Sequence, residues 1–519
     1  MLMFRRMVVM TALAASTAAV GFAQTDSATA APKIGPALIK LDAYVRGAMK
    51  KTKVPGVAVA VVYKDQVVFL RGYGERKIGS DAKVDPDTVF EIASLSKPIS
   101  STIVASLVGT GEVGWDDRIE NLDPKFKLSN PQISEQVTIR DFLSHRSGLP
   151  TTGGDILESL GYSRPEVLHQ LRFVPLTGEF RKSYQYSNFG YTEAAIAAAK
   201  KAGERWEEIA EERLYEKIGM HSTSSRFSDY ADTPNKAALH YLDDDGVFKN
   251  RFVREADAEA PAGGVSSNVR DLAQWMRLQL GEGSFNGQQV VSREALEETH
   301  KAQICRTAPK NVVPGECPGD QYYGLGWNVG KDSEGRKQLN HSGAFVLGSA
   351  TSVYLVPSEQ IGIVVLGNST PVGLPEAISA SFLDYFHYGA VKADYLAKFG
   401  PVFAEMREES QASSPNYSEM KPPGSPSPGR PISSYRGKYF NRFYGTLEIS
   451  VVRNQLLLRL PPRGAYYELT HWDGDTFTYY ITGEDMGVAR RGVKFLGGGK
   501  QVLIQNLAIV NNGIFTKVE

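Results

Sequence analysis

The sequence predicts a mixed α/β (α+β) chain, in which an antiparallel sheet flanked by helices and a helical region is followed by a small all-β barrel. β-Rich runs around short polar breaks occur at 55–70 and again at 351–366, with helical patterns between them. Two such hairpins, although far apart in sequence, can join as one antiparallel sheet. After a Ser-, Pro- and Gly-rich stretch, short β-runs separated by turn residues predict the barrel.

The N-terminus has the pattern of an export signal. Arg5 and Arg6 precede an apolar run from Met7 to about Val20, and Ala23 is a small residue suited to cleavage. A membrane anchor is the alternative, but the run is short for a spanning helix and polar residues interrupt it. We therefore expect a periplasmic or secreted protein with no integral membrane segment once the signal is removed.

Length and charge indicate how many domains the chain has and which class of partner is excluded. A chain of 519 residues is too long for one ordinary core, which predicts two domains. The 58 basic and 58 acidic residues balance, which argues against a nucleic-acid partner. The expected divisions are a signal peptide at 1–23, a disordered leader at 24–35, a first domain at 36–395, a linker at 396–431 that is rich in Pro, Ser and Gly from 411, and a C-terminal β-barrel domain at 432–519.

The two cysteines of the chain, Cys305 and Cys317, lie in one loop-like stretch. In the oxidising compartment that export implies, such a pair is expected to form a disulfide. A catalytic thiol and a two-cysteine metal site are the alternatives, and we favour the disulfide over both. The chain has no H-E-x-x-H pattern either, so no metal and no cofactor are expected.

Ser94 and Lys97 stand three residues apart at the start of an apolar run that predicts a helix ending near Gly109. Residues i and i+3 share a helix face, so the two side chains should point the same way. A serine becomes a good nucleophile when a base takes its proton. Lys97 can be that base only if its pKa falls from about 10.4 towards neutrality. Many helices carry the same spacing as solvated decoration, so the pair alone is weak evidence.

A second candidate stretch, Tyr186-Ser187-Asn188, lies between two helical segments. If it is extended, Tyr186 and Asn188 project to one side. The alternative is an aromatic-rich loop packed on the core. A nearby ammonium group would lower the pKa of the Tyr186 phenol and make it a second proton acceptor.

Two further features have structural interpretations. His145 ends a short helix before a turn, where a histidine is more often a structural hydrogen-bonding group than a catalytic base. The glycine loop at 262–268 precedes a helix, but it has no P-loop lysine, so we interpret it as a structural turn and not a phosphate site.

Three motifs follow one another along the chain: Ser94-Leu95-Ser96-Lys97, Tyr186-Ser187-Asn188 and His341-Ser342-Gly343. In this order they resemble the S-x-x-K, Y-x-N and K-T-G or H-x-G motifs of the serine β-lactamase and penicillin-binding-protein superfamily, on the side of AmpC-like enzymes, esterases and D-aminopeptidases. The similarity covers roughly 36–389. The tail resembles the small β-barrel appended to some serine peptidases of this superfamily.

The resemblance implies a β-lactamase/transpeptidase-like fold and a role for each matched residue. Ser94 would be the nucleophile, and Lys97 and Tyr186 would share proton transfer. Asn188 would orient Lys97 and bind the substrate amide. The backbone N–H groups of Ser94 and Ala344, the residue after Gly343, would form the oxyanion hole.

One residue departs from the β-lactamase pattern, because His341 stands where those enzymes usually have lysine. With an ordinary pKa near 6.5 it is mostly neutral at pH 7, which weakens the attraction for a substrate carboxylate. This difference favours ester or peptide substrates over β-lactams.

We therefore expect an exported serine hydrolase that acts through an acyl-enzyme on small-molecule esters or on D-amino-acid-containing amides and peptides. One alternative is a β-lactamase or a penicillin-binding D-Ala-D-Ala carboxypeptidase. A second alternative, of another class, is a non-catalytic binding protein on the same fold.

Overall fold

The computed structural model describes residues 34–307, 317–412, 414–484, 487–508, 510 and 512–519. The expected signal peptide at 1–23 and most of the leader at 24–35 lie outside these residues. Helix α1 (Ile34–Thr52) takes in the last two leader residues, which were expected to be disordered. Within the described ranges, no helix combines the length and the apolar character needed to cross a membrane.

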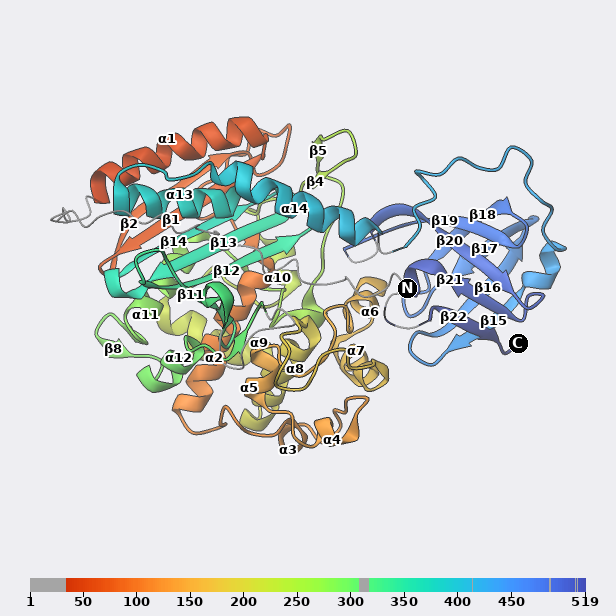
Figure 1. Cartoon of the computed structure of the whole chain (residues 1–519), viewed down its shortest axis with the longest axis horizontal. Helices are drawn as coiled ribbons and strands as arrows, with labels where there is room; N and C mark the ends of the chain where they lie inside the picture. The colour runs from red at the N-terminus through yellow and green to blue at the C-terminus, as the bar shows by residue number, and fades with distance from the viewer. Residues whose placement is uncertain (1–33, 308–316, 413, 485–486, 509, 511) are drawn as a thin grey trace.

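The first domain is built on one antiparallel sheet with the strand order β2-β1-β14-β13-β12-β11-β10-β9 (Figure 1). The two predicted hairpins are β1–β2 and β13–β14, and they join because β1 pairs with β14, with Val57 opposite Gly367. The prediction of one sheet from two distant hairpins is confirmed. The strands are β1 (Gly56–Tyr63), β2 (Gln66–Gly74), β9 (Ile304–Cys305), β10 (Tyr322–Tyr323), β11 (Asn328–Lys331), β12 (Lys337–Phe345), β13 (Ser349–Val356) and β14 (Ile361–Gly367).

Helices cover both faces of this sheet, so β1, which is almost entirely apolar, is buried on both sides (Figure 1). Val57, Val59 and Val61 pack towards α1 and α13 (Leu374–Tyr388). The alternate residues Ala58 and Ala60 face the larger core on the opposite side.

That opposite side holds α2 (Ser96–Gly109), α8 (Asn188–Ala202) and α11 (Val269–Leu280). The next helical segment is α9 (Trp206–Ala210), which continues into a π-helical turn and a 3-10 turn. The other helices are α3 (Ile119–Leu122), α4 (Pro131–Ser134), α5 (Ile139–Leu143), α6 (Asp155–Leu160), α7 (Arg164–Gln170), α10 (Phe227–Asp232) and α12 (Arg293–Thr299). Short strand pairs are β3 (Phe90–Glu91) with β6 (Ser266–Ser267), β4 (Tyr241–Leu242) with β5 (Phe248–Lys249) and β7 (Ser284–Phe285) with β8 (Gln288–Gln289).

The expected linker at 396–431 is partly wrong, because α14 (Tyr395–Ala412) occupies its first half. Phe399 and Phe403 of α14 pack with Ala377 of α13, and this apolar contact favours a helix over a loose connection. The rest of the linker runs extended along the barrel, where the Tyr417 N–H donates to the carbonyl of Arg490.

The C-terminal domain is a closed antiparallel barrel, as predicted, in which β15 pairs with β22. Its strands are β15 (Gly437–Asn441), β16 (Gly445–Val452), β17 (Gln455–Arg459), β18 (Tyr466–Asp473), β19 (Thr476–Gly483), β20 (Gly487–Leu496), β21 (Gln501–Ile504) and β22 (Ile514–Lys517). Closure leaves the barrel without unpaired edge strands.

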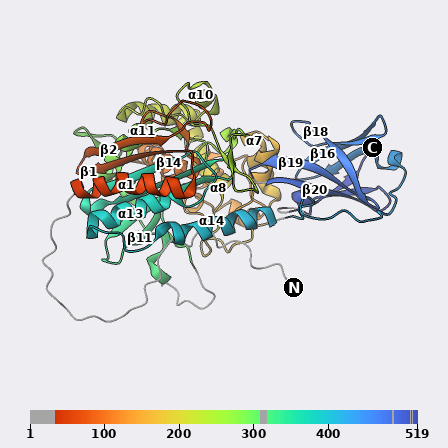
Figure 2. The same cartoon turned by 90° about the horizontal axis from the view of Figure 1, so that it is seen from above.

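The barrel lies beside the first domain, with α14 leading from one to the other (Figure 2). The Tyr162 hydroxyl, after α6, donates to the carbonyl of Tyr444 in the barrel. Arg463 of the barrel forms an exposed ion pair with Glu255 at 3.5 Å. The two domains are therefore in direct contact in addition to the covalent connection.

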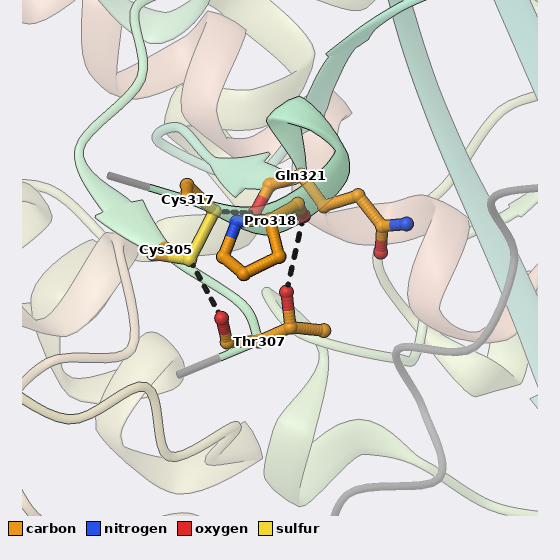
Figure 3. The surroundings of a disulfide bond; sticks show 5 residues. All are labelled: Cys305, Thr307, Cys317, Pro318 and Gln321. Carbon is orange, nitrogen blue, oxygen red and sulfur yellow. Dashed lines mark hydrogen bonds between the residues drawn. A yellow bond between two sulfur atoms is a disulfide. The ribbon is translucent and has the colours of Figure 1, made fainter. Parts of the chain in front are cut away.

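Cys305 and Cys317 form a disulfide bond that ties β9 to the segment before β10 (Figure 3). Two neighbouring contacts join the same two segments. The Thr307 hydroxyl donates to the Pro318 carbonyl at 3.4 Å, and Cys305 lies opposite Tyr322 in the β9–β10 ladder. The disulfide closes a loop with a sequence separation of 12 at the edge of the sheet.

Replacing both cysteines, Cys305→Ser with Cys317→Ser, should lower the free energy of unfolding by about 3 kcal/mol, because the unfolded chain regains the entropy of an open loop. Urea unfolding measures the change. Wild-type protein in a reducing buffer should match the double variant, and the double variant should not respond to reductant. Equal stability of the oxidised wild type and the double variant would contradict this role.

Candidate active site

Ser94 lies in a 3-10 turn, Ala93–Leu95, directly before α2. The residue before it, Ala93, has a φ of 50°, a left-handed conformation that residues with side chains adopt only when the surroundings impose it. Two hydroxyl groups of β13 bind the backbone just ahead of this turn. Ser349 donates to the Glu91 carbonyl at 2.5 Å, and Thr351 donates to the Ile92 carbonyl at 2.8 Å.

The amine of Lys97 is fully buried and lies 3.0 Å from the Ser94 hydroxyl oxygen. It donates to the Asn188 side-chain oxygen at 2.7 Å and to the carbonyl of Ala262 at 2.9 Å. The expected shared helix face of Ser94 and Lys97 is therefore present. The glycine loop, interpreted from the sequence as a structural turn, supplies one of the two acceptors.

The Tyr186 hydroxyl donates to the Ser94 hydroxyl oxygen at 2.7 Å. Ser187 has extended backbone and caps α8, so Tyr186 and Asn188 point to the same side. The Lys97 amine also lies 4.5 Å from the centre of the Tyr186 ring. Two segments far apart in the sequence thus meet at the Ser94 hydroxyl, and a third, the loop at Ala262, contacts the Lys97 amine.

Burial lowers the pKa of Lys97 to about 7, although Glu259 and Asp155 act in the opposite direction. The amine is therefore substantially neutral near pH 7. A neutral amine has two N–H donors and one lone pair. Asn188 and Ala262 accept the two donors, which leaves the lone pair for the proton of Ser94.

Burial has the opposite effect on Tyr186 and raises the pKa of its phenol well above the usual value. The hydrogen bond with Ser94 lowers this pKa only in part. The expectation that a neighbouring ammonium group would make Tyr186 acidic is wrong, because loss of hydration dominates and Lys97 itself is largely neutral. Tyr186 is a proton donor in this arrangement.

The third motif lies on β12, next to the Ser94 turn. A Cβ atom on Gly343 would lie 2.2 Å from the Ile92 carbonyl oxygen and 3.0 Å from the Leu95 nitrogen, so only glycine fits. Ala344 follows Gly343 and stands opposite Ala350 of β13. β11 pairs with β12 from Lys337 to Asn340 and stops before the motif begins.

His341 is buried, and burial, assisted by Lys97, lowers the pKa of its imidazole to about 3. Its Nδ1 lies 2.8 Å from the Ser342 carbonyl, which can only accept, so this nitrogen carries the proton. Nε2 then accepts a hydrogen bond from the Tyr323 hydroxyl at 3.0 Å. His341 is a neutral, fixed hydrogen-bonding group with no positive charge.

The sequence had not assigned two aromatic residues to this region. His145 accepts the Ser187 N–H at 3.1 Å, which fits the structural role expected for it, yet its ring also lies 4.4 Å from that of Tyr186. Tyr323 lies 4.8 Å from His145 and links it to His341. The position of His145 at the end of a short helix favoured a structural role, and no role at the site was assigned to Tyr323 from the sequence.

Comparisons with known proteins identify the family of the first domain and several similar chains. The Beta-lactamase family model matches residues 41–381, and a domain of unknown function, DUF3471, matches residues 421–496. The second match covers the end of the linker and most of the barrel.

Several relatives and a solved structure are similar over most of the chain. A protein named unguisins hydrolase ungD, from Aspergillus violaceofuscus, is 26% identical over 460 residues, which cover 83% of this chain and 81% of that protein. Protein flp from Staphylococcus aureus is 21% identical over 357 residues, 68% of each chain. The octameric penicillin-binding protein homologue from Pyrococcus abyssi has a similar fold, with a TM-score of 0.56 and 20% identity over 92% of this chain and 100% of that one.

Replacing Gly343 by Ala should destabilise the protein by about 1–3 kcal/mol, because the new methyl group would clash with both the Ile92 carbonyl and the Thr351 hydroxyl. Thermal unfolding monitors the loss. Gly330→Ala on β11 is the matched control, since its Cβ would meet nothing closer than 3.3 Å. A Gly343→Ala protein as stable as that control would argue against the close approach of β12 to the Ser94 turn.

Proposed function

Since this chain belongs to the beta-lactamase family, we propose that it is an exported serine hydrolase that forms an acyl-enzyme on Ser94 and cleaves esters or D-amino-acid-containing amides and peptides. The observation that carries the proposal is the contact of one hydroxyl group with both a buried amine and a phenol. The Ser94 oxygen lies 3.0 Å from the Lys97 amine and 2.7 Å from the Tyr186 hydroxyl.

In the proposed acylation step, the Ser94 oxygen attacks the substrate carbonyl and its proton moves to the lone pair of Lys97. The carbonyl oxygen becomes negatively charged, and the N–H groups of Ser94 and Ala344 would stabilise it. Lys97 is favoured over Tyr186 as the base, because burial lowers the pKa of the amine to about 7 and raises that of the phenol.

The leaving group then needs a proton. Tyr186 donates its proton to the departing oxygen or nitrogen and regains one from the Lys97 ammonium, so that both groups return to their starting states. Water next adds to the acyl group, Lys97 accepts a proton from that water, and the Ser94 oxygen leaves and is reprotonated. The proton that Lys97 takes from the water is the one that returns to Ser94, so Ser94, Lys97 and Tyr186 all regain their starting protonation states. The cycle uses no cofactor.

Two observations bear on the substrate. His341 carries no charge, so a substrate carboxylate gains little from this position, which favours esters and amides over β-lactams. β11 stops before the Ser342–Phe345 part of β12, which leaves that strand edge beside Ser94 suited to an extended peptide chain. A β-lactamase or a D-Ala-D-Ala carboxypeptidase is the alternative within the same chemistry.

Export to the periplasm or the medium is part of the proposal. It rests on the charged and apolar N-terminal pattern at 1–23, and the Cys305–Cys317 disulfide supports it, because such bonds persist in oxidising compartments. The mature chain would then begin at Gln24.

The rate at which a fluorophosphonate labels Ser94 should rise with pH and reach half its maximum near pH 7. The pKa of Lys97 in the folded protein is lowered to about 7, so its amine is protonated and inactive below that pH and neutral above it. A pH series of labelling rates measures this, because the probe itself does not titrate. Lys97→Arg should label poorly at every pH, since a guanidinium stays charged. A flat profile between about pH 5 and about pH 9 would exclude a lysine base.

The substrate class can be tested with nitrocefin, a short-chain nitrophenyl ester and a D-alanine amide. We expect turnover of the ester or the amide to exceed that of nitrocefin, and Ser94→Ala to abolish both turnover and labelling. Ser106→Ala is the control, because Ser106 lies in α2, about three turns beyond Ser94, and its hydroxyl donates to the Ile103 carbonyl of the same helix. Fastest turnover of nitrocefin would favour the β-lactamase alternative, and failure of the probe to label Ser94 would favour a binding protein.

A further inference from the structure

The hairpin formed by β19 and β20 reaches from the barrel to the first domain (Figure 1). Glu484 follows β19, and its carboxylate accepts hydrogen bonds from two successive backbone N–H groups of the first domain. Oε1 accepts from Val346, and Oε2 accepts from Leu347 at 3.1 Å. Both residues belong to the turn between β12 and β13, two and three residues after Ala344.

The turn that Glu484 holds is in contact with the residue before the nucleophile. Phe345 packs in one buried cluster with Ala93 and Ala256. Ala93 is the residue with a φ of 50° that sets the direction of the Ser94 turn. A displacement of Phe345 would therefore remove the apolar support of a strained backbone position.

The β12–β13 hairpin also holds the Ser94 turn from its other strand. The Ser349 and Thr351 hydroxyls bind the carbonyls of Glu91 and Ile92. Ser349 begins β13 directly after the turn, so the position of that turn determines where this hydroxyl lies. Support from both strands of one hairpin thus converges on the segment just before Ser94.

Charged side chains connect the β12–β13 turn to Lys97. Arg254 lies over the Phe345 ring at 4.9 Å and donates to Glu158 and, at 2.9 Å, to Glu259. Glu484 adds to the negative field that these carboxylates exert on Arg254. Glu259 in turn acts on Lys97. The barrel therefore contributes a carboxylate to the charged groups around Arg254, one of which, Glu259, acts on Lys97.

We propose that the barrel is a working part of the active site, in which Glu484 is a positioning residue that fixes the β12–β13 turn and, through Phe345, the Ser94 turn. In this position, Glu484 fixes where the Ser94 oxygen lies relative to the backbone N–H of Ala344. This inference rests on the proposed function of Ser94. Hydrogen bonds from backbone N–H groups to a carboxylate are among the stronger kinds, so Glu484 can act as a firm anchor.

The test uses full-length Glu484→Ala and Glu484→Gln, with the rate of fluorophosphonate labelling at Ser94 as the readout. We expect Glu484→Ala to label about tenfold more slowly or worse, since small displacements of reacting groups reduce rates strongly. Glu484→Gln should be intermediate, because only one of its two terminal atoms can accept an N–H. With an ester substrate, kcat should fall while KM changes little.

Glu468→Ala is the matched control, because Glu468 is an exposed glutamate on β18 of the same barrel. It should label like the wild type. If Glu484→Ala does not fold, the labelling rate of Glu484→Gln relative to the wild type tests the positioning role. Labelling of the folded Glu484 variants at the wild-type rate would overturn the proposal.

Hydrogen exchange separates failure of this inference from failure of the proposed function. If the probe does not label even the wild type, the function assigned to Ser94 is wrong, and the exchange of backbone amides still tests the positioning role. Glu484→Ala should then speed exchange at Val346, at Leu347 and in the Ala93–Leu95 turn. Faster exchange at Val346 and Leu347 alone would show a local anchor without coupling and would overturn the proposal.

Discussion

The contact between the buried amine of Lys97 and the hydroxyl of Ser94 is the interaction on which the site depends. Burial removes the water that would hold a charge on the amine, and the acceptors Asn188 and Ala262 fix its two N–H groups. The lone pair of the neutral amine is thereby directed at Ser94. The same burial keeps the proton on Tyr186, so one physical cause gives the two neighbours of Ser94 opposite roles.

The rest of the first domain keeps this contact in place. The 3-10 turn before α2 carries Ser94, and the first turn of α2 carries Lys97. The start of α8 carries Asn188, and the β12–β13 hairpin supports the backbone before Ser94. The backbone conformation of Ala93 is unfavourable by itself, and hydrogen bonds from β13 and the packing of Phe345 maintain it. β12 and β13 are paired along the whole hairpin, from Leu339 opposite Leu355 to Phe345 opposite Ser349, so neither strand can shift independently of the other.

The barrel is joined to that framework by contacts of different kinds. An exposed ion pair such as Arg463–Glu255 contributes little to stability by itself. The Glu484 carboxylate, which accepts two backbone N–H groups near Arg254, is a stronger and more specific contact. The association of the two domains thus includes one specific contact at the β12–β13 turn, although the barrel forms its own closed sheet.

The sequence alone determined most of the local structure and the choice of candidate reacting groups. Periodicity is a property of neighbouring residues, so it predicted β1, β2, β13, β14, the helix after Ser94 and the barrel. The resemblance of three motifs to a known family proposed Ser94, Lys97 and Tyr186 as the reacting residues. Tertiary structure decided the features that depend on distant neighbours. It placed helix α14 in the expected linker and set the direction of the Tyr186 pKa shift. It also brought His145 against the Tyr186 ring and Glu484 of the barrel against the backbone of Leu347. Burial and the sum of surrounding charges depend on which segments meet, and no local pattern in a single chain records that.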